Sequence, residues 1–516
     1  MSFPWLTVLA AVPIVGAVLV LFVPRGRNGA LTKQAALAVS LVTLVVAVAM
    51  AFQYDPNSSG QGGFQLVEDH MWIQAFGAHY ALGVDGIGLT LILMTAILTP
   101  VVILASWNDG DNGRWSVNAF FGWMLALEGL ALGVFESTDV FLFYVLFEAT
   151  LIPIYFLIGG YGGPQRSYAA VKFLLYSLLG GLLMLASVIG LYAVSSDAGG
   201  PTYLLTALRD IPISQTTGRW LFLGFFAAFA VKAPMWPLHT WLPDAASEAT
   251  PGTSVLLVSV LDKIGTFGMI RFCLQLFPEA SRWASPVIIA FAVFSVLYGA
   301  LLAIGQNDIR RLIAYTSISH FGFIVMGIFA FTSQSTAGAT LYMFNHGMST
   351  AALFLVTGFL ISRRGSKMIT DFGGVQKIAP VLAGMFLLAG LSSLSLPGLG
   401  PFVSEFLVLA GTFTHSIPAA VFATLGIVLA AMYILWMYQR TMTGPVRADN
   451  VGITDLGLRE KVALAPVMVL IVALGFFPQP LLKVINPTVG STLTHVGVHD
   501  PQPSVPVSAT NQETQP

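Results

Sequence analysis

The sequence predicts an all-α polytopic membrane protein. Of its 516 residues, 56% are apolar and only 9% are charged, whereas soluble proteins carry about 25% charged residues. A soluble protein of this length could not cover its surface with so few charges, so a cytosolic globular enzyme is excluded. The chain also contains about fourteen long apolar runs, close to the roughly 20 residues that a helix needs to cross a bilayer.

These runs divide the chain in order. The first has no basic residue ahead of it and no small-residue cleavage site, so we interpret it as a retained span. The predicted spans lie near 3–23, 35–53, 81–106, 115–136, 139–160, 168–195, 219–238, 251–275, 285–305, 311–331, 337–361, 378–412, 419–439 and 462–484. They form an N-terminal part (1–114), two five-span groups (115–275 and 285–440), and a loop with the last span (441–484). The polar segment 485–516 is expected to be a mostly disordered outer tail.

The basic residues predict the orientation. Of the 23 lysines and arginines, 16 fall in one set of alternate loops and 4 in the other, and Lys232, Lys263 and Arg271 lie within or beside spans. Loops rich in lysine and arginine stay on the cytoplasmic side. We therefore expect both termini outside and the loops 24–34, 362–377 and 440–461 in the cytoplasm.

The overall charge and the cysteine content exclude several functions. A net charge of −1 and a pI near 6.7 give no basic surface for nucleic acid. The single cysteine excludes a disulfide framework and a cysteine-ligated iron–sulfur cluster within this chain. No cofactor or metal site is visible, so we expect none in this chain.

Several ionisable residues nevertheless fall inside the apolar runs. Each costs roughly 2.5–3.5 kcal/mol at the centre of a span. They are Glu128, Glu148, Lys232, Lys263, His320, His346 and Glu405. Structural ion pairs or satisfied core histidines would explain one or two of them. Acids and bases spread over seven spans fit a proton or ion relay better, because a relay needs a series of titratable groups.

Two members of this region fit a relay less well. Glu128 could simply face a neighbouring helix. Asp262 directly precedes Lys263, so the two side chains point about 100° apart on one helix.

Prolines interrupt two of the charged spans. Pro234 and Pro237 follow Lys232, and Pro397 and Pro401 precede Glu405. Interrupted spans in corresponding positions of two halves indicate an ion site in transporters. These are the seventh and twelfth spans, so their spacing predicts two five-helix repeats, spans 4–8 and 9–13. Because five is odd, the second repeat is expected to be inverted.

Four segments carry a family resemblance. They are VKAPMWPLHTWLPDAASEATPGTSVLLVSVLDKIGTFGMIRF (231–272), LGVDGIGLTLILMTAILTP (82–100), FYVLFEATLIPIYFLIGGYG (143–162) and AYTSISHFGFIVMGI (314–328). Together they resemble the antiporter-like subunits of respiratory complex I over about residues 80–480. The resemblance implies fourteen helices, two inverted repeats and broken helices 7 and 12. Multisubunit sodium/proton antiporters and membrane-bound hydrogenases share this fold.

Glu405 separates the three types of complex I subunit with this fold. The L-type and N-type carry a lysine in the broken twelfth helix, and the M-type carries a glutamate. Residues 485–516 are also too short and proline-rich for the C-terminal helix of the L-type. The resemblance therefore implies the M-type, a non-redox subunit of NADH:quinone oxidoreductase that moves protons when quinone is reduced elsewhere.

The resemblance also assigns roles to residues. It implies that Glu148 and Lys232 modulate proton affinity, that Lys263 is the central relay lysine, and that Glu405 is the outlet. His320 and His346 would extend the connection. His239 matches a family histidine just past the broken helix; the alternative to a relay role is that it simply organises the break.

Partners and location follow from the same resemblance. We expect L-type and N-type neighbours, lipids and a bacterial plasma membrane, with FMN, iron–sulfur clusters and quinone on other subunits. The alternatives are a subunit of a sodium/proton antiporter or membrane-bound hydrogenase, and a structural spacer in a membrane complex.

Overall fold

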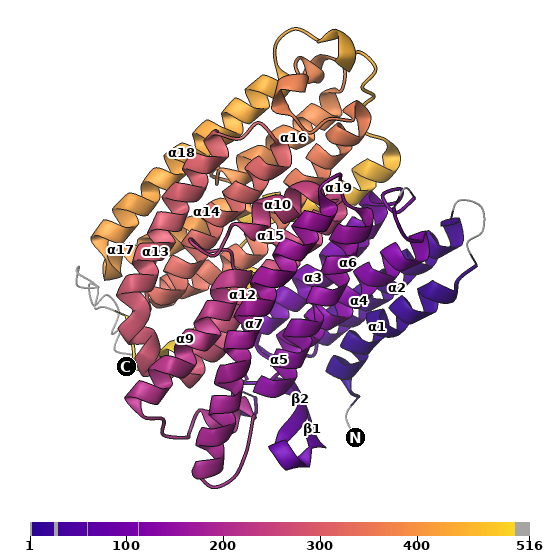
Figure 1. The fold of residues 1–516 in the computed structure, drawn as a ribbon. Coiled ribbons are helices and arrows are strands. Elements are labelled where there is room, and N and C mark those ends of the chain that lie inside the picture. Colours follow the sequence, from indigo (N-terminus) through magenta and orange to yellow (C-terminus); the bar gives the residue numbers. More distant parts are fainter. Residues whose placement is uncertain (1–2, 25–28, 59, 112, 501–516) are drawn as a thin grey trace, which may run out of the picture.

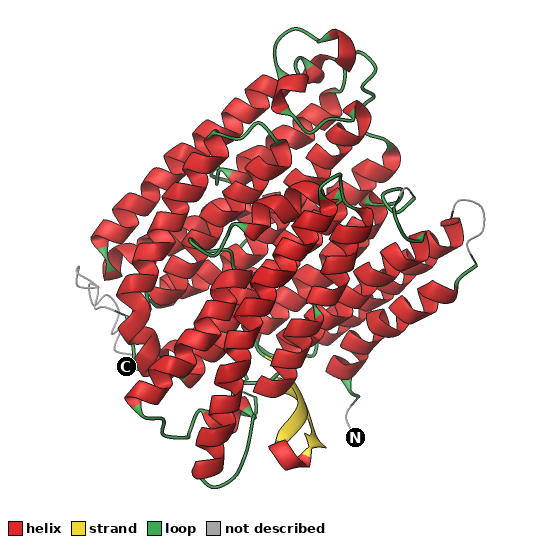
Figure 2. Cartoon of the chain, in the orientation of Figure 1, coloured by secondary structure: helices red, strands yellow, loops and turns green. Residues whose placement is uncertain are grey.

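The computed structural model describes residues 3–24, 29–58, 60–111 and 113–500 of the chain. Helices make up most of this part (Figures 1 and 2), which agrees with the predicted class. A two-stranded hairpin lies in the segment 54–80 and just beyond it, where the sequence predicted a loop and the start of a span. Its strands are antiparallel, with His70 opposite Tyr80.

The first half of the chain forms two strands and most of the peripheral helices. Its elements are α1 (Trp5–Phe22), α2 (Ala30–Ala51), β1 (Gln65–Ile73), η2 (Gln74–Phe76), β2 (Ala78–Val84), α3 (Gly86–Ala105), α4 (Val117–Glu136), α5 (Val140–Ala149), α6 (Leu151–Tyr161), α7 (Arg166–Asp197), α8 (Leu205–Leu208), α9 (Gln215–Lys232) and α10 (Trp241–Glu248).

In the second half, the named elements of the described residues are all helices. Its elements are α11 (Pro251–Val255), η3 (Leu256–Leu261), α12 (Asp262–Gly268), η4 (Met269–Leu274), α13 (Pro278–Ile304), α14 (Ile309–Phe329), α15 (Ser333–Arg364), η5 (Ile369–Asp371), η6 (Val375–Lys377), α16 (Pro380–Ser393), α17 (Gly400–His415), α18 (Ile417–Met442), η7 (Ala448–Asn450), α19 (Leu458–Phe476) and α20 (Gln479–Val496).

Each predicted span overlaps one of these helices, but fewer pass a strict test of length and apolarity. Within the described residues, 11 helices are long and apolar enough to cross a membrane, or up to 12 if the bent pair α19 and α20 is one span. The other predicted spans correspond to α9, which carries Arg219 and Lys232 near its ends, and to the broken pair α16 and α17. The predicted membrane class is therefore confirmed, and the count of fourteen is not.

Burial separates central from peripheral helices. The most apolar part of the stretch Pro251–Leu274 is 100% buried, and the most apolar parts of α14 and α15 are each 94% buried. In contrast, α1 and α2 are 33% and 28% buried and expose valines and leucines. The apolar outer faces are suited to lipid. The central helices are those that carry Lys263, His320 and His346.

The predicted interruption after Lys232 is present. Here α9 ends at Lys232 and the chain becomes helical again at Trp241, because Pro234 lacks the N–H that a continuing helix needs. The Trp241 indole Nε1 donates to the carbonyl of Val231 at 3.0 Å, and the backbone N–H of Trp236 donates to Ser295 Oγ at 2.9 Å. Irregular backbone is tolerated at membrane depth when such partners satisfy it.

The second predicted interruption lies between α16 and α17, over residues 394–399. Ser395 adopts a positive φ of 57° at this break. The side-chain amide of Asn345 donates to the carbonyl of Gly400 at 2.8 Å and so supports the start of α17. A side chain from central helix α15 thus fixes the broken segment.

The helix that carries Lys263 is itself irregular. Its two π-helical segments, η3 and η4, flank the short α-helix α12. π-Helical turns are rare and often mark functional sites. Gly265 lets this helix approach the end of α9, because a Cβ there would lie 2.5 Å from the Ala233 nitrogen. The Lys232 end of α9 therefore packs directly against the Lys263 helix.

The expected disordered tail is wrong for residues 485–496. They belong to α20, which runs from Gln479 to Val496 and buries Ile485, Val489 and Leu493. These apolar residues recur at helical spacing on one face, and the remaining polar residues lower the mean hydropathy below that of a span. Residues 501–516 lie outside the described part of the chain.

Candidate functional site

Lys263 and His346 meet in the centre of the protein. Lys263 Nζ lies 2.6 Å from His346 Nδ1 and also donates to the Val258 carbonyl at 3.0 Å. The ammonium group lies 4.5 Å from the centre of the Phe321 ring. Both Lys263 and His346 are buried. A proton on Lys263 therefore has a direct hydrogen-bonded acceptor and no access to bulk water.

The histidine ring continues this contact toward α14. The rings of His346 and His320 are 5.1 Å apart, edge to face, and the His320 ring lies 5.9 Å from that of Tyr342. Tyr342 precedes His346 by one turn on α15, so these two side chains lie on the same face of that helix. Both rings lie close to the ring of His320 on α14. The hydroxyl of Tyr342 donates to Glu405 Oε2 at 3.2 Å.

Glu405 ends the series at the second helix break. Besides Tyr342, its Oε2 accepts a hydrogen bond from the Ser395 hydroxyl at the break. The structure therefore brings four of the predicted residues into one buried chain. The central chain runs through Lys263, His346, His320, Tyr342 and Glu405.

Glu148 and Lys232 form a separate group. Lys232 Nζ lies 5.1 Å from the Phe147 ring and 5.6 Å from the Phe173 ring. Within the described residues, neither Lys232 Nζ nor Glu148 Oε1 has a hydrogen-bond partner. The predicted pair is thus open in this structure.

A glycine on α7 sets the position of the Glu148 carboxylate. A Cβ on Gly181 would lie 1.7 Å from Glu148 Oε1. The carboxylate therefore occupies the space that a side chain at position 181 would fill. Because residue 181 is glycine, Glu148 can lie directly against α7. Sequence reading did not single out Gly181, since its role depends on packing between two spans.

Two further acids singled out in the sequence are also buried. Asp262 and Glu128 are 0% and 1% exposed, and their carboxylate oxygens have no hydrogen-bond partner in the described part of the chain. The same holds for Glu136, the last residue of α4. The sequence did not single out Glu136, because it lies at the very end of its apolar run.

His239 lies apart from the central chain. It sits in the break between α9 and α10, and its ring packs edge to face on Tyr298 of α13 at 5.2 Å. Its Nδ1 has no hydrogen-bond partner among the described residues. The structure places it beside the break and not in contact with Lys263.

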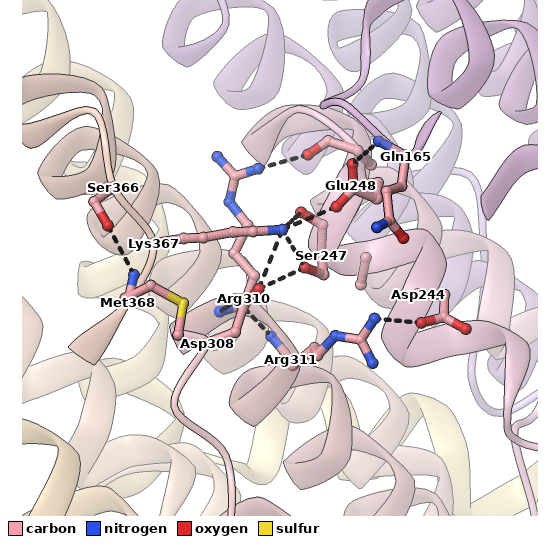
Figure 3. A network of polar contacts seen from close by, with 12 residues as sticks. Gln165, Asp244, Ser247, Glu248, Asp308, Arg310, Arg311, Ser366, Lys367 and Met368 are labelled. Atoms are coloured by element: carbon pink, nitrogen blue, oxygen red, sulfur yellow. Dashed lines mark hydrogen bonds and ion pairs between the residues drawn. The ribbon is translucent and has the colours of Figure 1, made fainter. Parts of the chain in front are cut away.

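An ionic network joins the two halves of the chain (Figure 3). Lys367 Nζ lies 3.0 Å from Glu248 Oε1 and 3.1 Å from Asp308 Oδ2, and it donates to Ser247 Oγ at 2.7 Å. Asp244 pairs with Lys172 at 2.7 Å and with Arg311. These contacts attach α10, the second part of the broken helix, to the start of α14.

The described residues contain no group of three or more histidine, cysteine, aspartate or glutamate side chains that could hold a metal ion. The chemistry available to the central chain is proton transfer between nitrogen and oxygen atoms. The irregular helices around it can also change the distances between its members.

Residues 137–430 match the family described as NADH:quinone oxidoreductase/Mrp antiporter, transmembrane. The chain is 51% identical over 540 residues to NADH-quinone oxidoreductase subunit M of Mycobacterium tuberculosis, covering 98% of this chain and 96% of that protein. It is 37% identical over 500 residues to the subunit M of Rhodobacter capsulatus, covering 94% and 95%.

Solved structures give the same result. A chain of respiratory complex I from Thermus thermophilus with bound NADH superposes with a TM-score of 0.86 at 30% identity, covering 96% of this chain and 100% of that one. A chain of the Mrp complex from Dietzia sp. has a TM-score of 0.82 at 21% identity, with the same coverage, and shows that the fold is shared.

Proposed function

The chain belongs to the NADH:quinone oxidoreductase/Mrp antiporter transmembrane family, and from this premise we propose that it moves protons across the membrane as a membrane-arm subunit of an NADH-quinone oxidoreductase. Its relatives at 51% and 37% identity carry the name subunit M. The observation that carries the proposal is the buried central chain from Lys263 to Glu405.

The central chain has the atoms that a proton relay requires. A proton leaves Lys263 Nζ for His346 Nδ1, across the 2.6 Å contact. The His346 ring then releases a proton from its other nitrogen, Nε2, toward His320 and Tyr342. Glu405 receives the proton through the Tyr342 hydroxyl, which already donates a hydrogen bond to the Glu405 carboxylate. Small side-chain rotations or water bridge the ring-to-ring steps.

The open Glu148–Lys232 group supplies the control in this proposal. When the carboxylate approaches Lys232, it stabilises the ammonium form and holds a proton there. When the carboxylate withdraws, as in this structure, the burial of Lys232 favours release of that proton toward Lys263. The end of α9 at Lys232 packs against Gly265, two residues after Lys263, so the two lysines lie on helices in direct contact.

Finer features of the proposal concern topology. We propose fourteen spans with two inverted five-helix repeats, spans 4–8 and 9–13, each with one broken helix. The two observed breaks, after Lys232 and before Gly400, support this arrangement. We further propose that both termini and the β-hairpin face outward and that the Lys367 network faces the cytoplasm, as the distribution of lysine and arginine indicates.

The proposed setting is a bacterial plasma membrane. The neighbours would be the L-type and N-type antiporter-like subunits, with lipids covering the apolar outer helices. This chain would carry no redox group, and FMN, iron–sulfur clusters and quinone would lie on other subunits. Protons would pass from the cytoplasm to the outside while quinone reduction elsewhere drives the cycle.

The experiment uses inverted membrane vesicles that contain the assembled complex. NADH-driven acidification and NADH oxidation are measured for Lys263→Gln and for Lys483→Gln, an exposed lysine outside the central chain. We expect Lys263→Gln to lose most proton pumping, alone or together with NADH oxidation, and Lys483→Gln to retain both. Normal acidification per NADH oxidised in Lys263→Gln would contradict the proposal. Sodium-dependent proton exchange without NADH would instead favour the antiporter alternative.

A further inference from the structure

A second buried cation lies on the same helix as Lys263, toward the proposed outer side. Arg271 is 2% exposed, and its Nη2 donates to Asp85 Oδ1 at 2.9 Å. Asp85 is equally buried and caps the start of α3 by accepting the Gly88 N–H at 2.7 Å. Asp85 Oδ1 therefore accepts hydrogen bonds from both Arg271 and the Gly88 backbone.

The residues between Lys263 and the outer side form one stripe. Lys263, Phe267, Arg271 and Gln275 recur every four residues, so they lie roughly along one face of the helix. At about 1.5 Å per residue, Arg271 lies about 12 Å beyond Lys263. The stripe thus leads from the relay lysine through an aromatic ring to a guanidinium.

Aromatic rings enclose this guanidinium. The Arg271 Cζ lies 4.6 Å from the Phe64 ring and 4.9 Å from the Phe267 ring. Arg209 Cζ also lies 5.6 Å from the Phe64 ring, and Arg209 donates a hydrogen bond to the Gln275 side chain. Two arginines thus surround one ring. Within the described residues, the carboxylate hydrogen-bonded to Arg271 is Asp85, and exposed Asp210 directly follows Arg209.

A polar cavity of about 210 Å³ lies on the outward side of these arginines. It is lined by Tyr54, Asp85, Arg209, Gln275, Thr488 and Thr492, among others. Water can therefore approach Asp85 and Arg209 from the outer end. Inward from Gln275, the next two members of the stripe toward Lys263 are Arg271 and Phe267.

Arginine is unsuited to a relay but suited to a barrier. Its guanidinium stays protonated in proteins, so it neither accepts nor releases a proton. A fixed positive charge beside a narrow path repels protons and other cations, as in channels that exclude them. The central chain, in contrast, consists of lysine, histidine, tyrosine and glutamate, all of which can exchange a proton.

We propose that Arg271 is an electrostatic barrier that closes the outer end of the Lys263 helix to protons. A proton on Lys263 would then reach the outside only through Glu405, and protons from the outside could not return to Lys263 along the shorter route past Gln275. This inference rests on the proposed proton-translocating function and adds a residue that prevents back-leak.

The test compares proton leak among charge variants of the assembled complex in inverted vesicles. The main variant is Asp85→Asn/Arg271→Gln, which removes both charges and leaves no buried carboxylate unpaired. After NADH oxidation is stopped with an inhibitor, the decay of the established pH gradient is followed. A unit charge 12 Å away at an effective dielectric of about 20 changes the local proton concentration about tenfold. Because Asp85 contacts Arg271 and offsets most of its charge at this distance, we expect the decay to accelerate by about twofold.

Three further variants separate a barrier from a structural ion pair. Arg271→Lys places a cation beside Asp85, whose carboxylate holds the proton on the lysine, and is expected to leak less than the double variant. Arg209→Gln weakens the positive charge without stranding a carboxylate and should leak slightly more than wild type. Arg282→Gln is the matched control, an outer arginine that bonds to the Val496 carbonyl and should decay as wild type does.

Two outcomes would overturn the barrier. One is wild-type decay in both the double variant and Arg209→Gln, and the other is equal leak in the double variant and in Arg282→Gln. If the double variant fails to assemble, Arg209→Gln and Arg271→Lys still decide the result. Failure of the proposed function would look different, since NADH-driven acidification would then be insensitive to Lys263→Gln.

Discussion

Lys263 and His346 share a hydrogen bond in a region that excludes water, although 83 residues separate them in the chain. No carboxylate contacts the Lys263 ammonium among the described residues, and its other partners are a backbone carbonyl and an aromatic face. The neutral imidazole is therefore the nearest base. This arrangement favours transfer of the proton over its permanent retention, because an ion pair with a carboxylate would hold it on the lysine.

Replacing His346 tests this contact. In His346→Phe, the ring volume is largely retained but both nitrogens are lost. We expect the rate of NADH-driven proton pumping to fall by about 100-fold or more, the typical contribution of a positioned acid–base group. Acidification and NADH oxidation in inverted vesicles measure the effect. His415→Phe changes a histidine at the end of α17 and serves as the control. Equal pumping in the two variants would remove His346 from the relay.

A smaller effect is expected at Tyr342. In Tyr342→Phe, Glu405 loses one of its two hydrogen-bond donors and keeps Ser395. A water in place of the hydroxyl can still carry the proton to Glu405, and losing one hydrogen bond to a buried group costs about 1–3 kcal/mol, so we expect pumping to fall about fivefold or more without loss of assembly. The double variant Tyr342→Phe/Ser395→Ala should lose far more, because the carboxylate then has no donor. A double variant no worse than Tyr342→Phe would show that the two hydroxyls do not act on Glu405.

Gly181 offers a test of Glu148 that leaves the carboxylate itself intact. In Gly181→Ala, the new Cβ would fall 1.7 Å from Glu148 Oε1, so the side chain must move toward or away from Lys232. We expect altered coupling, seen as a changed ratio of protons pumped to NADH oxidised. Gly384→Ala is the control, since a Cβ there has no heavy atom within 4 Å. Identical ratios in Gly181→Ala and wild type would argue against control by the Glu148 position.

The sequence was sufficient to predict the helical membrane class, the two breaks and most of the central chain. Apolar runs and prolines act locally, so they can be read from neighbouring residues. Lys263, His320, His346 and Glu405 stood out because a charge or histidine in a span is costly and therefore rare. The structure places all four in one connected series.

Features that depend on packing could not be predicted. Tyr342 looks like any aromatic residue of a span, and Ser395 acts only because the break turns its backbone. The helix α20 was missed because its apolar residues form a narrow stripe. The contact of Lys367 with Glu248 joins segments 119 residues apart, and a pairing over that separation cannot be read from one sequence.

The Lys367 network gives a prediction about stability. Lys367→Ala leaves Glu248 and Asp308 without their shared cation, while Asp308 keeps Ser247. The lysine side chain is 30% exposed, so solvent screens the pairs and we expect a loss of about 1 kcal/mol. The unfolding temperature of the purified complex should be modestly lower for Lys367→Ala than for wild type. Lys377→Ala, at an exposed position, is the control and should change nothing measurable.

Asp109 predicts how stability depends on pH. It lies in the loop between α3 and α4, outside the spans, where burial raises its pKa from 3.8 to about 6 despite the nearby charge of Arg310. Between these values the folded carboxyl keeps a proton that the unfolded one has lost. The unfolded state thus binds fewer protons, and the free energy of unfolding falls as pH rises from about 4 to about 6.

Asp109→Asn should remove this dependence, because an amide does not titrate. At pH 7 the variant should unfold at a higher temperature than wild type, since it buries a neutral group in place of a charge that the site disfavours. The difference should shrink toward pH 4, where Asp109 is neutral as well. Unfolding of the detergent-solubilised complex, followed between pH 4 and pH 8, measures both effects. Parallel pH curves for Asp109→Asn and wild type would show that the Asp109 carboxyl is not the group that titrates.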